Sequence, residues 1–173
     1  RPAGGGSIVW NGTPTLFYYG NPEGICIARS ADGLRTWQKH SRNPLIPHYP
    51  DENPRVFDPC VWQEGDKWYA LSGGRLGRGS LEGSRDTAFV FQSSDFLEWE
   101  YLGLFYEPGE ENDCAVPDFF PLRDTHMLLF ASHKRGVQYY LGNYSAGRFQ
   151  PRHHGRMNFG PFGLDSGNLC AAF

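Results

Sequence analysis

The sequence predicts an all-β protein that forms part of a β-propeller, and three observations support this prediction. A motif with Ser, Asp, Leu and Trp occurs twice, as SADGLRTW at 30–37 and as SSDFLEW at 93–99. A pattern of apolar run, polar turn and second apolar run occurs three times. The chain also holds Gly 22, Pro 13 and 16% aromatic residues, which suits short strands joined by many turns. Repeated strand-rich units are typical of propeller blades.

Each predicted blade has four strands. The first two form hairpins, which we expect in the segments 7–20, 58–74 and 117–133. A third strand follows each hairpin, at 24–30, 87–94 and 136–145. A short outer strand should follow at 37–40, at 99–102 and near Phe149. No segment shows a convincing helical period. Since the first strand of a blade lines the central channel, residues at its start are the candidates for chemistry.

Composition and charge exclude several classes of partner. The formal net charge is −3, and the Lys and Arg residues are scattered, so no basic face for nucleic acid is predicted. No apolar stretch approaches the roughly 18 residues of a membrane helix, and no signal peptide is visible, so localisation stays open. The four cysteines, at positions 26, 60, 114 and 170, lack metal-ligand spacing. We expect buried free thiols rather than a disulfide, and no metal site.

Three motifs resemble those of glycoside hydrolase family 32, the β-fructosidases, which include invertase, inulinase, levanase and sucrose-6-phosphate hydrolase. Gly6-Ser7 stands in place of Ser-Gly-Ser, Phe57-Asp58-Pro59 in place of Arg-Asp-Pro, and the segment 116–121 (VPDFFP) in place of Cys-Pro-Asp-Leu-Phe-Pro. Their order and spacing match across essentially the whole chain. The resemblance implies a five-bladed β-propeller, no cofactor, and a sugar or fructan as the bound partner.

The chemistry implied by the resemblance is retaining hydrolysis of β-fructofuranosides such as sucrose, inulin or levan. It uses two carboxylates about 5 Å apart, a nucleophile and an acid/base. Asp58 matches a third carboxylate of the family, which binds sugar hydroxyls and stabilises the transition state. An alternative interpretation of Asp58 is an aspartate before proline that ends a turn.

Two departures from the family pattern affect the candidate site. The acid/base glutamate is replaced by Ala115, and the motif arginine by Phe57. Residues two apart in a strand share a face, so Asp113 is our candidate acid/base, and Arg55 is a candidate for binding substrate. Asp113 also fits a solvated loop aspartate within an acidic run.

Three further residues are candidates for substrate binding. Ser7 opens the first blade, Asp118 follows Pro117 as in the family, and His133 ends the third hairpin and could donate to a sugar hydroxyl. Asp118 also suits a role in bracing the start of its strand, and His133 suits an ordinary turn position.

The nucleophile motif of the family, with Asn-Asp-Pro-Asn-Gly, is absent from the sequence. We expect the chain to be a fragment of a longer enzyme, inactive alone, with the nucleophile upstream and the remaining blades as its partner. The expected blades span about 7–50, 55–105 and 114–162, and a further blade starts at 165–173. Two alternatives stay open: another five-bladed propeller glycosidase or phosphorylase (arabinofuranosidase/xylosidase or mannoside phosphorylase type), and a catalytically inactive propeller that binds carbohydrate.

Overall fold

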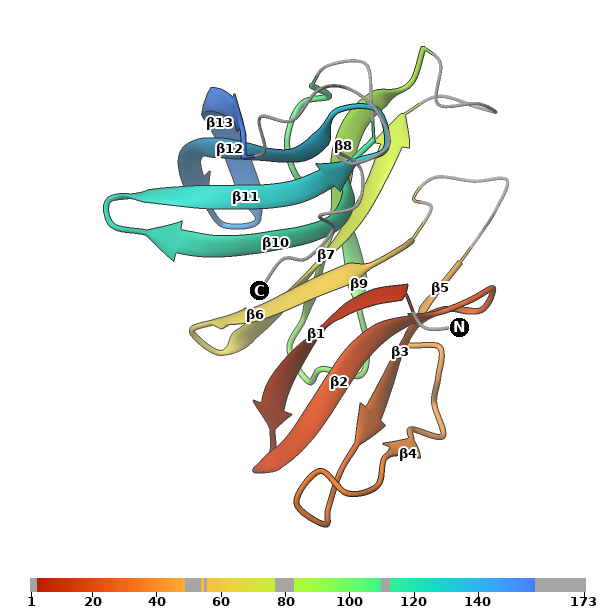
Figure 1. The fold of residues 1–173 in the computed structure, drawn as a ribbon. Coiled ribbons are helices and arrows are strands. Elements are labelled where there is room, and N and C mark those ends of the chain that lie inside the picture. Colours follow the sequence, from red (N-terminus) through yellow and green to blue (C-terminus); the bar gives the residue numbers. More distant parts are fainter. Residues whose placement is uncertain (1–2, 49–53, 55, 77–82, 110–112, 158–173) are drawn as a thin grey trace.

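The computed structural model describes residues 3–48, 54, 56–76, 83–109 and 113–157 of the 173-residue chain. Within this part the secondary structure consists of strands, arranged as three antiparallel sheets that follow one another in chain order (Figure 1). The predicted all-β fold with three successive sheets is confirmed; each sheet holds a run of four strands, and the first has one short strand more.

The first sheet has the order β1-β2-β3-β4, with a short fifth strand, β5, also paired to β3. Its strands are β1 (Ala3–Trp10), β2 (Thr13–Gly20), β3 (Gly24–Arg29), β4 (Gln38–Lys39) and β5 (Ile46–Pro47). The second sheet contains β6 (Pro59–Glu64), β7 (Lys67–Leu76), β8 (Arg85–Ser93) and β9 (Glu100–Leu104). The third contains β10 (Ala115–Leu122), β11 (Thr125–Ser132), β12 (Gly136–Ser145) and β13 (Arg148–Arg156).

The elements differ from the sequence prediction at several places. Strand β1 begins at Ala3, before the expected start at Ser7, and the short strand β5 was not predicted. Strand β10 begins at Ala115, before the expected start at Pro117, and β7 continues two residues beyond the expected hairpin, to Leu76. The outer strand near Phe149 is long, because it pairs with β12 along nearly its whole length.

The repeated Ser-Asp motif shapes the turn before each outer strand. Ser30 Oγ donates to Asp32 Oδ1, and Asp32 accepts from the backbone and the hydroxyl of Thr36. These Thr36 hydrogen bonds lower the pKa of Asp32 to about 2. Asp95 repeats the arrangement, with a hydrogen bond from Ser93 Oγ and another from the Glu98 amide. The motif therefore has a scaffolding role in both sheets.

Two apolar cores lie between the three sheets, on opposite faces of the middle one. Strands β7 and β8 alternate between them: Ala70 and Phe89 face the first sheet, while Leu71 and Val90 face the third. A strand buried on both faces needs a continuous apolar run, which explains the sequence WYAL followed by the run TAFVF. Aromatic residues make up about half of each core.

The first strands of the three sheets lie next to one another, since β6 contacts both β1 and β10. This is the arrangement expected of inner strands in a propeller. Cys26, Cys60 and Cys114 are buried free thiols, as predicted; Cys170 lies outside the described residues. In the described part of the chain, no helix is long and apolar enough to span a membrane.

Candidate functional site

Asp58 lies immediately before β6, at the start of the first strand of the second sheet. The backbone there is held by Ser72 of β7, which is 0% exposed. Ser72 Oγ accepts from the Phe57 amide at 2.8 Å and donates to the Phe57 carbonyl at 2.9 Å. This pair of hydrogen bonds fixes the backbone of the residue before Asp58, and thus the direction of the Asp58 side chain.

The Asp58 carboxyl is half-buried, and burial raises its pKa above the usual range. The Val116 amide and the nearby His133 partly offset this rise. Two groups of the third sheet therefore act on a carboxylate of the second. Burial raises the pKa of Tyr19, at the end of β2, and the charge of Asp58 raises it further.

Val116 adopts a left-handed backbone conformation, with φ 48°. A β-branched residue rarely occupies this region, because its side chain crowds the backbone. The pairing of β10 with β11 shifts register between Ala115 and Asp118, which marks a β-bulge at the same place. The bulge re-aims the Val116 amide, and this amide acts on Asp58. Strained backbone beside a half-buried carboxylate points to a functional position.

Asp113 and His133 form the closest polar pair of the site. Asp113 Oδ1 accepts from the His133 backbone amide at 3.1 Å, and Oδ2 accepts from His133 Nδ1 at 2.5 Å. The carboxylate is turned inward, since the Asp113 side chain is 9% exposed and the His133 side chain is 66% exposed. The interpretation of Asp113 as a solvated loop residue is therefore wrong. Because β10 starts at Ala115, strand alternation does not place Asp113; the turn after β11 does.

The segment that carries Asp113 is fixed against β7. The Cys114 amide donates to the Gly74 carbonyl at 2.9 Å. Gly73 faces the Cys114 carbonyl oxygen so closely that a Cβ atom would collide with it, and it would also lie 2.9 Å from Pro117 Cδ. A glycine at 73 is thus required for this close approach.

Phe57, at the position of the motif arginine, packs edge-on against two aromatic rings. Its ring centroid lies 5.4 Å from that of Tyr19 and 5.2 Å from that of His48. His48 Nδ1 is held by the Val56 carbonyl at 3.0 Å. The arrangement puts a partly exposed aromatic edge beside Asp58, where the family pattern has a cation.

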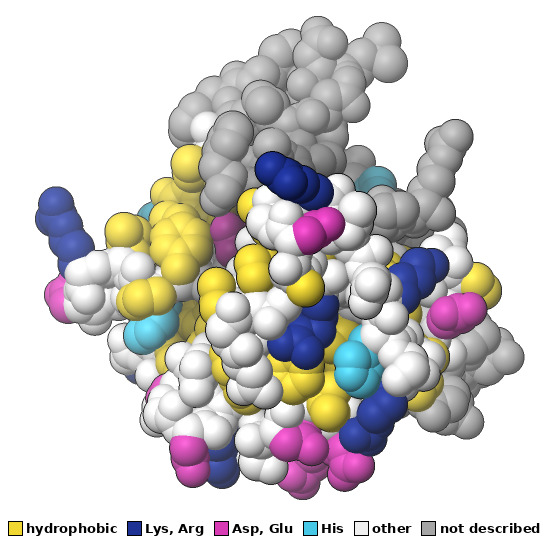
Figure 2. All heavy atoms as spheres, turned by 90° about the horizontal axis from the view of Figure 1, so that it is seen from below, with side chains coloured by type: hydrophobic (Ala, Val, Ile, Leu, Met, Phe, Trp, Pro, Cys, Tyr) yellow, Lys and Arg dark blue, Asp and Glu magenta, His cyan; other side chains and the backbone are white. Residues whose placement is uncertain are grey.

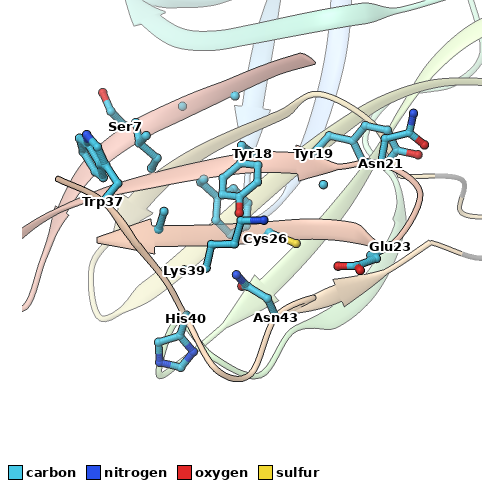
Figure 3. Close-up of a pocket in the computed structure, with 16 residues that line it drawn as sticks. Ser7, Tyr18, Tyr19, Asn21, Glu23, Cys26, Trp37, Lys39, His40 and Asn43 are labelled. Carbon is cyan, nitrogen blue, oxygen red and sulfur yellow. The ribbon is translucent and has the colours of Figure 1, made fainter. Parts of the chain in front are cut away.

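Ser7 lies apart from this group, on the opposite face of the first sheet. It lines a pocket of about 860 Å³ together with Tyr18, Trp37, Lys39 and other residues of β1 to β4. In Figure 3, Ser7 and Trp37 stand at one end of the pocket, and Asn21 and Glu23 at the other. Figure 2, seen from the side on which β4 lies in Figure 1, shows hydrophobic side chains at the surface among positive and histidine groups.

The remaining sequence candidates have different surroundings. Asp118 is half-buried on β10, and its Oδ1 accepts from Cys60 Sγ at 3.8 Å, a link between inner strands that suits a bracing role. Burial raises the pKa of the Cys60 thiol to about 12, so it stays a neutral donor. Ala115 is half-buried and has no proton to transfer. Arg55 lies outside the described residues.

The structure thus pairs Asp113 with His133, whose charge acts on Asp58, and it places Ser7 apart from them. Sequence reasoning missed Ser72 as the clamp for Asp58, and it missed Tyr19 and His48 as neighbours. A polar residue inside the apolar run YALSGG was the available signal for Ser72. Tyr19 and His48 have no such sequence signal, because they reach the site only through tertiary packing. The described residues contain no cluster of three groups able to hold a metal ion.

Comparison with known proteins identifies the family of the chain. Residues 3–167 match the family model of the glycosyl hydrolases family 32 N-terminal domain. The chain belongs to this family. Family 32 membership confirms the resemblance carried by the three motifs.

Two curated relatives show which members of family 32 are similar. The chain is 32% identical to the sucrose-6-phosphate hydrolase of Klebsiella pneumoniae, over 94% of this chain and 38% of that protein. It is 33% identical to the insoluble β-fructofuranosidase isoenzyme CWINV1 of Arabidopsis thaliana, over 69% of this chain and 22% of that one. The chain therefore spans well under half the length of these relatives.

The fold is also shared with solved structures. The family 32 β-fructofuranosidase BmSUC1 of Bombyx mori superposes with a TM-score of 0.72 at 21% identity, covering 88% of this chain and 37% of that chain. A mutant of the same enzyme has been solved in complex with sucrose. At this identity the likeness shows the fold, and the five-bladed propeller is the architecture to which the three sheets correspond.

Proposed function

We propose that the full-length protein carrying this chain hydrolyses β-fructofuranosides, such as sucrose, inulin or levan, with retention of configuration. The observation that supports this most is the hydrogen-bonded pair of Asp113 and His133, whose imidazole acts electrostatically on the half-buried Asp58, in a chain of family 32. Paired acidic groups suit chemistry on a glycosidic bond. The relatives that are sucrose-6-phosphate hydrolases and β-fructofuranosidases support the same substrate class.

In this proposal Asp58 accepts hydrogen bonds from fructosyl hydroxyls and stabilises positive charge that develops on the sugar. Its half-buried position strengthens such contacts, because water competes less for the carboxylate. The exposed edge of Phe57, supported from behind by Tyr19, would pack against the apolar face of the ring. The Asp113 site supplies the acid/base function that Ala115 cannot, and the nucleophilic carboxylate comes from the rest of the protein.

The experiment compares fructose release from sucrose and inulin by the full-length protein and by Asp58→Asn. Asp66→Asn, an exposed turn residue at the other end of β6, is the matched control. We expect Asp58→Asn to lower kcat/KM by at least about 100-fold, because a transition-state contact is lost, and Asp66→Asn to leave it unchanged.

A second candidate function is carbohydrate binding without turnover. The replacement of the acid/base glutamate by Ala115 and of the motif arginine by Phe57 favours it. It predicts that the wild-type protein binds fructan and releases no fructose. That result would overturn the hydrolase proposal and leave the family assignment intact.

A further inference from the structure

We infer that the proton in this site is transferred by the His133 imidazole, with Asp113 as the residue that positions it. This inference rests on the proposed fructosidase function and names the group that replaces the missing glutamate. It departs from the sequence prediction, in which the Asp113 carboxylate itself is the acid/base.

The first argument is the orientation of the Asp113 carboxylate. Both of its oxygens are already used: Oδ1 accepts from the His133 backbone amide, and Oδ2 accepts from His133 Nδ1. The side chain is 9% exposed, so little of it faces a substrate. A carboxylate bound in this way has no free oxygen directed outward and is poorly placed to protonate a leaving group.

The second argument is the exposure of the imidazole. The His133 side chain is 66% exposed and begins the turn that joins β11 to β12. Because a carboxylate only accepts hydrogen bonds, Nδ1 carries the proton shared with Asp113, and this fixes the tautomer and the plane of the ring. Nε2 is then the nitrogen that remains for a ligand.

The third argument is proximity to the proposed sugar site. His133 acts on the Asp58 carboxyl, and it does so together with the Val116 amide. Asp113 contacts the His133 ring directly, and Asp58 is close enough for its carboxyl to respond to the charge of that ring. The imidazole is thus oriented by one carboxylate and lies within electrostatic reach of the carboxylate proposed to bind the sugar.

The proposed step balances as follows. Nε2–H of the imidazolium gives its proton to the glycosidic oxygen while the bond from fructosyl C2 to that oxygen breaks, and the electron pair stays on the departing alcohol. The fructosyl group passes to the nucleophilic carboxylate of the family mechanism. Neutral Nε2 then takes a proton from the attacking water, which releases fructose and restores the imidazolium.

The test uses two substrates in the full-length protein: sucrose, whose leaving group needs a proton, and β-D-fructofuranosyl fluoride, whose leaving group does not. We expect His133→Ala to lower kcat/KM for sucrose by about 10²- to 10⁴-fold and to change fluoride hydrolysis only slightly. Added imidazole should restore part of the sucrose activity of His133→Ala. It should restore none in Asp113→Asn, because that variant still carries its own His133 imidazole.

His133→Asn separates a chemical role from a structural one. The Asn amide can still donate to Asp113 in the place of Nδ1, but it cannot transfer a proton. We expect His133→Asn to be as inactive on sucrose as His133→Ala, and equally active on the fluoride. His153→Asn, an exposed histidine on β13, is the matched control and should match wild type on both substrates.

Three outcomes would overturn the inference. Full sucrose activity in His133→Asn would make the ring a structural clamp. Equal losses of kcat/KM on sucrose and on the fluoride in His133→Ala would show that His133 does not transfer the proton. In either case wild-type hydrolysis would leave the proposed function standing. A wild-type protein that hydrolyses neither substrate would overturn the proposed function together with the inference.

Discussion

Replacing Ser72 with Ala tests whether the backbone before Asp58 must be fixed for the site to work. The variant removes both hydrogen bonds between the Ser72 hydroxyl and the Phe57 backbone. It leaves the Phe57 amide and carbonyl without these partners. Each hydrogen bond contributes about 1 kcal/mol, so the free energy of unfolding should fall by about 2 kcal/mol. This corresponds to a roughly thirtyfold change in the unfolding equilibrium.

Ser30→Ala is the matched control for this variant. Ser30 is 1% exposed and also makes two hydrogen bonds, to Asp32 and from the Leu34 amide, but it serves the turn before β4. Denaturant unfolding should show a similar fall in the free energy of unfolding for both variants. Fructose release should fall by at least about tenfold only in Ser72→Ala, because small displacements of reacting groups are costly. Equal activity in the two variants would refute the idea that Ser72 positions Asp58.

Two further predictions concern the packing around the site. Gly73→Ala should lower both stability and activity, because its Cβ would collide with the Cys114 carbonyl oxygen. Gly6→Ala should be tolerated, because its Cβ would meet Val61 at an ordinary 3.5 Å. Unfolding and fructose release of the two variants check this, and a fully active Gly73→Ala would contradict it. Asp86, 1% exposed, accepts from the Tyr106 and Tyr140 hydroxyls through Oδ2, and burial raises its pKa. Its stabilising contribution is therefore present below the unfolded pKa and lost as the pH rises through the raised folded value. Asp86→Asn should gain stability over wild type as the pH rises from about 4 to about 8 in urea unfolding, and a constant difference across that range would count against the account.

The strands were predictable from sequence because their signals are local. Alternating apolar residues and the turn chemistry of Gly and Asp fix the hairpins, and the Ser30 and Ser93 motifs mark the same turn in two sheets. The family motifs located Asp58 for the same reason, since they are short and contiguous.

The geometry of the site was less predictable because it depends on contacts between segments. Asp113 precedes its strand, and only the turn at His133 shows which way its carboxylate points. The left-handed conformation of Val116 has no sequence signal, because nothing local favours a β-branched residue there. The sequence prediction chose Asp113 by assuming that the strand extends back to this residue. That premise is wrong, because β10 begins at Ala115.

The central claim is that the full-length protein hydrolyses fructosides with retention of configuration. The most direct test identifies by NMR, before mutarotation, which anomer of fructose is first released from sucrose. The account predicts that β-fructofuranose appears first, because a retaining mechanism inverts the anomeric centre twice. Initial release of the α-anomer, or sucrose binding with no fructose released, would contradict it.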